Sequence, residues 1–355
     1  RGNLPRLFGT DGGDALLIFR VDARTGAVER IAGRTGTLGM DFGRDPIYCL
    51  GLTRPGESVA HLRTFIARSG DADLREAAVE ALAVHHGGEV AAALAGILSR
   101  DGSADVRSEA AQGLAWQPEP GVLGPLMQAA MYDGSADVRR EAVEAIARID
   151  SPEARSTLRA LAMRGITPIT RRTAAEELGT RAADESFSTL LRVAYDEPQL
   201  HVQREAVENL ARYAPQDAQP ALVRIAWTHP NPTIARQAAE TLGTLPAPWA
   251  VEALDSIARR HPEVAVAHQA VESLAGYSPA VTSMMLYRIS STHRSRLVRQ
   301  EAFDQFRAQA RRHEQKRLDG HDPNPDPDFD VDVDPDPTSA SEPQAQSRSQ
   351  ARAKP

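Results

Sequence analysis

Residues 133–146 read DGSADVRREAVEAI, and 32 residues earlier the chain reads DGSADVRSEAAQGL. A larger residue, nearly always apolar, stands four positions before and four positions after the central alanine of each segment. This spacing places the three side chains on one face of a helix, and the small alanine lets a neighbouring helix approach closely. The alanine recurs at the same step at Ala78, Ala110, Ala142, Ala174, Ala206, Ala238, Ala270 and Ala302.

A leucine marks a second helix that precedes each of these segments. Breaker residues such as Asp133-Gly134-Ser135 separate the two helices. One helix pair cannot bury its apolar face alone, whereas stacked pairs form a continuous core. The sequence therefore predicts an all-α fold, a right-handed α-solenoid of about eight 32-residue helix-pair repeats. The leucines are Leu62, Leu94, Leu126, Leu158, Leu190, Leu222, Leu254 and Leu286.

The segment at residues 133–146 resembles the core of a HEAT repeat, of the short type also found in bacterial phycobilisome-lyase-like proteins. The resemblance covers residues 57–312. In that family an Asp in the turn and an Arg six residues later form ion-pair ladders between repeats. Asp101 with Arg107 and Asp133 with Arg139 match this pattern. The resemblance identifies a fold and leaves the function open.

Later repeats depart from the ladder pattern. Gly165 stands six residues before Arg171, and His229 stands six residues before Ala235. We therefore expect the ladder to be broken in the C-terminal half.

The two ends of the chain differ from the repeats. Residues 1–56 contain two apolar segments, 15–21 and 27–32, joined by a turn at residues 22–26, which predict a small β-rich N-terminal cap. Residues 57–318 form the predicted solenoid. The first 60 residues resemble exported bacterial HEAT-repeat proteins, and this resemblance favours an exported or periplasmic location over a cytoplasmic one.

Residues 319–355 are predicted to be a disordered acidic tail. They hold eight Asp and one Glu against two Arg and one Lys, and so carry most of the formal net charge of −7. Such a segment has too little apolar surface to fold. It lacks the Gly and the bidentate Glu of an EF-hand loop, so we expect no calcium site.

Two charged tracks lie opposite the predicted core face on the second helices. Each Arg precedes a Glu by four residues, so the two tracks predict either a surface for an extended partner or mutual neutralisation worth about 0.2–0.5 kcal/mol. One track holds Arg140, Arg172, Arg204, Arg236 and His268, and the other holds Glu144, Glu176, Glu208, Glu240 and Glu272.

A third track lies on the first helices, at Met131, Met163, Tyr195 and Trp227. Large apolar side chains that point outward are typical of a partner site. The alternative is packing between adjacent repeats, since a solenoid helix buries two flanks.

A fourth track consists of three histidines, a residue type that often binds metal. They are His229, His261 and His293. Stacked helices lie about 8–10 Å apart, whereas zinc ligands lie about 2.0–2.1 Å from the ion. Equivalent histidines are therefore too far apart to share one ion. We expect each near a helix C-terminus, where partial positive charge is favourable, and we predict no metal and no cofactor.

No catalytic constellation accompanies the repeats. The chain lacks the Walker A, GxSxG and HExxH motifs, and the repeated His-Glu pairs of deoxyhypusine hydroxylase are reduced to His313-Glu314.

The leading prediction is a non-catalytic scaffold that binds a protein or peptide. The alternatives are an accessory, chaperone-like or lyase-like subunit of an enzyme system, and nucleic-acid binding through the basic C-terminal repeats.

Nucleic acid is the weaker alternative because the body of the chain is near neutral. No apolar stretch is long enough to span a membrane. The arginines considered for the nucleic-acid alternative are Arg294, Arg296, Arg299, Arg311 and Arg312.

Overall fold

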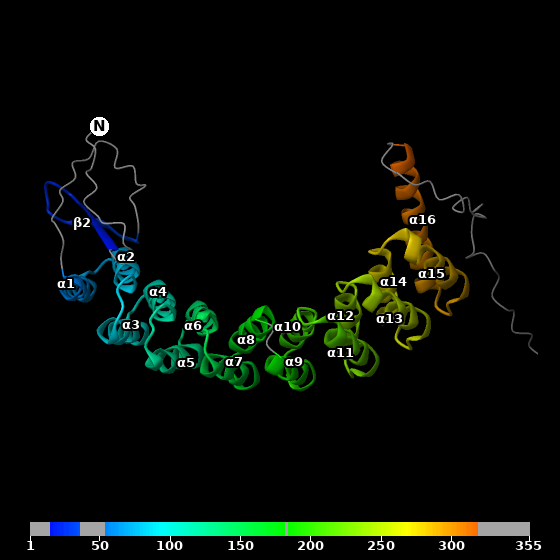
Figure 1. Ribbon diagram of the computed structural model, residues 1–355, viewed down its shortest axis with the longest axis horizontal. Helices are drawn as coiled ribbons and strands as arrows, with labels where there is room; N and C mark the ends of the chain where they lie inside the picture. Colours follow the sequence, from blue (N-terminus) through cyan, green and yellow to red (C-terminus); the bar gives the residue numbers. More distant parts are fainter. Residues whose placement is uncertain (1–14, 36–53, 182–183, 319–355) are drawn as a thin grey trace, which may run out of the picture. The chain divides into compact units, whose positions relative to one another are not determined.

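The computed structural model describes residues 15–35, 54–181 and 184–318 (Figure 1). Within these residues it contains two β-strands, one short 3-10 helix and sixteen α-helices. The chain divides into two compact units, residues 1–209 and residues 210–355, which are described separately. The tail at 319–355 lies outside the described residues, so its predicted disorder stays a prediction.

The N-terminal β element is an antiparallel hairpin of β1 (Ala15–Val21) and β2 (Val28–Thr35). The Asp22 carboxylate closes the turn by accepting hydrogen bonds from the backbone N–H groups of Arg24 and Thr25. The return strand extends three residues beyond the predicted segment. β2 packs against α2 (Ala72–Ala83), and the buried Ile31 faces away from solvent, so the hairpin covers the start of the first repeat.

Unit 1 stacks helix pairs. α3 packs against α4, α5 against α6 and α7 against α8, and the second helices α2, α4, α6 and α8 pack on one another in that order. The last residue of α10 begins unit 2. The remaining bounds are α1 (Pro55–Arg68), α3 (Gly88–Arg100), α4 (Ala104–Ala115), the 3-10 helix η1 (Pro120–Val122), α5 (Leu123–Tyr132), α6 (Ala136–Arg148), α7 (Pro152–Arg164), α8 (Pro168–Arg181), α9 (Asp184–Asp196) and α10 (Leu200–Leu210).

Unit 2 repeats the arrangement. α11 packs against α12, α13 against α14 and α15 against α16, and α14 packs between α12 and α16. The bounds are α11 (Pro215–Thr228), α12 (Pro232–Leu242), α13 (Ala247–Arg260), α14 (Val264–Ala275), α15 (Pro279–Thr292) and α16 (Arg296–Leu318).

The periodic positions form the core. All eight alanines of the second helices are 0% exposed, and none of the eight first-helix leucines is more than 1% exposed. Thr170 stands where its neighbours carry an apolar residue, and its buried hydroxyl donates a hydrogen bond of 2.8 Å to the carbonyl of Ala130. This bond satisfies the one polar side chain in that row. The predicted α-solenoid of helix-pair repeats is confirmed.

Candidate protein-binding surface

Bidentate ion pairs join the turns of successive repeats in unit 1. The guanidinium of Arg107 binds the carboxylate of Asp133 with both its Nε and Nη2 at 2.8 Å, and donates through Nη1 to the carbonyl of Asp101. Asp133 also accepts a hydrogen bond from the N–H of Ser135, at the start of α6. One carboxylate thus orders the turn before α6 and binds the preceding repeat. The same pairing occurs in Arg75 with Asp101 and in Arg171 with Glu197.

The ladder has a gap at Gly165. Arg139 donates to the carbonyl of Asp133, but its buried Nε has no hydrogen-bond partner among the described residues. The ladder then resumes at Glu197, which the sequence pattern did not reveal because a Glu-Pro pair replaces Asp-Gly there.

The three histidines of unit 2 occupy the position of the turn aspartates. The Nδ1 atom of each accepts a hydrogen bond from the backbone N–H two residues later, at 3.1 Å for His229, 3.1 Å for His261 and 3.0 Å for His293. His261 also donates from Nε2 to the carbonyl of Ala226. Each imidazole therefore orders the turn that joins the two helices of its repeat. Each histidine lies at the C-terminus of a helix, as predicted.

His293 gives this arrangement a pH dependence. Burial lowers the pKa of His293, and the nearby Arg294 and Arg299 lower it further. A lowered pKa in the folded state means stability that is present above the unfolded-state pKa and lost as the pH falls. We expect His293→Asn, which keeps an acceptor for the Ser295 N–H, to lose less thermal stability than the wild type between pH 7 and pH 5. Melting curves across this range test it, and an equal loss in both proteins would contradict it.

Most arginines of the Arg track form an ion pair with the glutamate four residues later on the same second helix. Arg140 contacts Glu144 at 2.8 Å. The corresponding distance is 3.7 Å for Arg204 with Glu208 and 3.8 Å for Arg236 with Glu240. No ion pair joins Arg172 to Glu176 in the part of the chain that the structure describes. Pairs this exposed contribute about 0.2–1 kcal/mol and leave little net charge to attract a partner.

The predicted apolar stripe is partly covered. Met131, Met163 and Tyr195 are half-buried on α5, α7 and α9. Trp227 on α11 is 36% exposed and packs against His261, with ring centroids 4.9 Å apart. Trp227 therefore contributes to packing between repeats, and the role of the stripe as a partner site stays a prediction.

Carboxylates gather on α2 and α4 in a cluster that the charged tracks predicted from the sequence do not include. Burial is the largest cause that raises the pKa of Glu109 to about 7, and the charges of Glu80, Glu76 and Glu141 raise it further. Burial also raises the pKa of Glu76, with the charge of Asp105 contributing next. No cation lies within ion-pair distance of Glu76 or Glu109 among the described residues. We call Glu76, Glu80, Asp105 and Glu109 the carboxylate cluster.

The cluster exists because its repeats lack the usual arginine. Glu76 and Ser108 occupy the positions that hold Arg140 and its equivalents in the next repeats. Glu141, one repeat later, is paired with Arg148 at 3.0 Å. The missing arginines were visible in the sequence, but the approach of Glu109 to α2 depends on how the repeats pack.

The arginines of the C-terminal repeats bind within the fold. Arg294 donates to the carbonyls of His261 and Pro262, and Arg299 donates to the carbonyl of His293. These guanidinium groups are therefore partly engaged before any phosphate could bind them.

The family model described as HEAT repeats matches residues 91–179, 123–200 and 188–275, which together cover more than half of the chain. The chain belongs to the HEAT-repeat family. No curated protein matches it. None of the described helices combines the length and the apolar character that crossing a bilayer requires.

Solved structures of helical proteins are similar to this HEAT-repeat chain. Human deoxyhypusine hydroxylase is 19% identical over 72% of this chain and 97% of its own, with a TM-score of 0.31. The complex of CpcE and CpcF of phycocyanin lyase from Nostoc sp. PCC7120 is 16% identical over 78% and 100%, with a TM-score of 0.34. Kap121p is 13% identical over 75% and 38%, with a TM-score of 0.43. TM-scores this low assign the chain neither a reaction nor a partner.

Proposed function

We propose that this HEAT-repeat chain is a protein-binding scaffold, and that a basic segment of the partner binds the carboxylate cluster on α2 and α4. HEAT repeats often serve as protein-interaction scaffolds. The observation that carries the proposal is the pair Glu76 and Glu109, two partly buried carboxylates without a cation among the described residues.

The cluster has a physical reason to attract a cation. Burial disfavours the ionised form of Glu109, and the like charges of the neighbouring carboxylates add to this effect, so that its pKa is raised to about 7. An Arg or Lys side chain placed beside Glu109 reverses the sign of that interaction and favours the ionised carboxylate. The same charges repel phosphate, which makes a basic protein segment a better fit here than a nucleic acid.

A binding experiment with a matched control tests the proposal. The probe is a short peptide of alternating Arg and Ser, titrated against the full chain by fluorescence anisotropy at low and at physiological salt. The double variant Glu76→Gln/Glu109→Gln removes the two carboxylates that lack a cation partner among the described residues. It should weaken binding about tenfold, since each charge contact contributes up to about 1 kcal/mol. Added salt should reduce wild-type binding.

The control variant carries Glu208→Gln and Glu240→Gln, whose carboxylates already lie beside Arg204 and Arg236. It should bind the peptide within about twofold of the wild type. Equal loss in both variants would mean that the peptide responds to net charge alone, and the assignment to α2 and α4 would be wrong.

Glu109 also predicts a pH dependence of stability. Because its folded-state pKa of about 7 lies above its unfolded value, the wild type is stabilised by the protonated form and loses this contribution as the pH rises through 7. We expect Glu109→Gln to be about 1 kcal/mol more stable than the wild type at pH 8, after allowance for solvent screening, and nearly equal to it at pH 5. Urea denaturation at both pH values measures this, and an equal difference at both would contradict it.

A further inference from the structure

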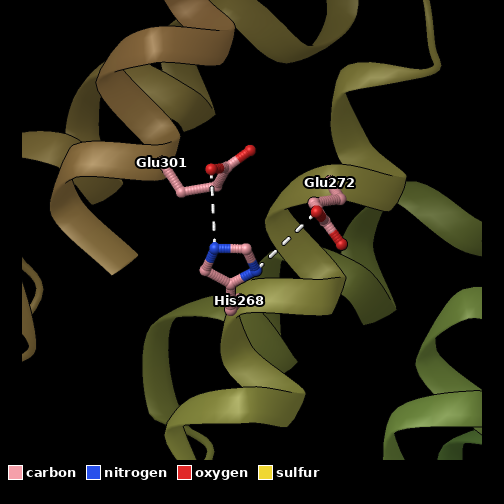
Figure 2. Close-up of side chains that lie close together, drawn as sticks. All are labelled: His268, Glu272 and Glu301. Atoms are coloured by element: carbon pink, nitrogen blue, oxygen red, sulfur yellow. Dashed lines mark ion pairs between the residues drawn. The ribbon is translucent and has the colours of Figure 1, made fainter. Parts of the chain in front are cut away.

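His268 lies between two carboxylates from different helices of unit 2 (Figure 2). His268 and Glu272 are one turn apart on α14, and Glu301 lies on α16. The His268 Nε2 atom is 3.4 Å from Glu301 Oε2, and Nδ1 is 3.9 Å from Glu272 Oε1. One ligand atom from each residue lies within 4.8 Å of the other two.

The preceding repeat shows what is special about these residues. At the equivalent positions it holds Arg236, Glu240 and Gln269. Arg236 donates a hydrogen bond of 2.6 Å to Gln269 Oε1 and lies 3.8 Å from Glu240. A nitrogen-bearing side chain therefore lies between two acceptors at the same place in both repeats. A guanidinium cannot coordinate a cation, however, whereas an imidazole can.

We propose that His268, Glu272 and Glu301 form a Zn²⁺ site that links α14 to α16. Two ligands about 2.0–2.1 Å from a tetrahedral ion are separated by roughly 3.3 Å. The Nε2 to Oε2 distance of 3.4 Å between His268 and Glu301 meets this requirement without movement of either helix. Glu272 is the most exposed of the three, at 43%, and its side chain has to turn from Nδ1 toward Nε2 to bind the same ion.

The donor set decides which ion fits. Calcium takes six to eight oxygen ligands and magnesium keeps an octahedral shell of oxygens, so neither favours an imidazole. One imidazole and two carboxylates suit zinc. Three protein ligands leave the fourth position to water. His268 is 25% exposed and Glu301 22%, which leaves a path for the ion and for that water.

Zinc binding must compete with the proton. A coordinating imidazole has to be neutral, so the affinity for zinc falls as the pH is lowered. The site lies in unit 2 and does not depend on the carboxylate cluster of unit 1, so the two proposals can fail separately.

The test is a titration of the metal-free full chain with ZnCl₂ by calorimetry at pH 7.5, and with CoCl₂ by visible absorption. We expect one equivalent of tightly bound Zn²⁺ and a cobalt spectrum typical of mixed nitrogen and oxygen ligands. His268→Arg restores the residue of the preceding repeats and can keep both ion pairs, so it should remain folded and bind zinc at least about 100-fold more weakly. Glu301→Gln should also bind zinc more weakly.

A matched control is His201→Arg, which removes an exposed histidine on α10 and should leave zinc binding unchanged. Three results would overturn the proposal. They are equal zinc affinity in the wild type and His268→Arg, absence of a one-to-one site, and calcium or magnesium binding as strong as zinc binding.

Discussion

Asp133→Ala should lower the free energy of unfolding by about 3 kcal/mol, because it removes one partner of a largely buried ion pair. The carboxylate side chain is 9% exposed and the Arg107 side chain 15%. Without Asp133 the guanidinium keeps its desolvation cost and loses two charge-assisted hydrogen bonds. The N–H of Ser135, in the turn before α6, also loses its hydrogen-bond acceptor. Urea denaturation followed by circular dichroism measures the change.

The control for this variant is Asp150→Ala. Asp150 contacts Arg155 at 3.0 Å, but its side chain is 90% exposed. Removing an exposed pair should change stability by less than about 1 kcal/mol. If the two variants lose equal stability, the ladder between repeats contributes no more than an ordinary surface ion pair.

Leu158→Ala should cost about 2–5 kcal/mol of unfolding free energy. Leu158 is the periodic leucine of α7 and is 1% exposed. Truncation removes apolar contact area and leaves a cavity that packed helices fill only in part. The matched control is Leu297→Ala on α16, because Leu297 is 58% exposed and its loss should change stability by at most about 0.5 kcal/mol. A loss below about 1 kcal/mol in Leu158→Ala would mean that the periodic leucines are not the core.

The fold could be predicted because its signal repeats. Ala142 and its equivalents recur at a fixed step, and a packing constraint that repeats eight times leaves few alternatives. The ion-pair ladder was only partly predictable. Arg171 pairs with Glu197, 26 residues later, and nothing local in the sequence links the two. The family pattern predicts ion pairs only in the repeats that keep Asp in the turn.

The candidate sites were less predictable because they form between repeats. Glu76 and Glu109 approach each other only after α2 packs on α4, and the pKa of Glu109 depends on burial that a helical wheel does not show. His268 and Glu272 are visible as a pair one turn apart. Glu301 joins them only because α16 packs on α14. The sequence predicted charged tracks along single helices, whereas the structure groups charges across them.

Proton release on binding tests whether a basic partner binds the carboxylate cluster. With a pKa of about 7, Glu109 is partly protonated at pH 7, and a cation beside it should lower this pKa and release the proton. Calorimetry with the Arg-Ser peptide in phosphate and in Tris buffer counts released protons, because arginine itself does not titrate near pH 7. We predict release of up to about half a proton per complex in the wild type and almost none in Glu109→Gln. Binding with equal proton release in both proteins, or with none in the wild type, would mean that the peptide does not bind beside Glu109.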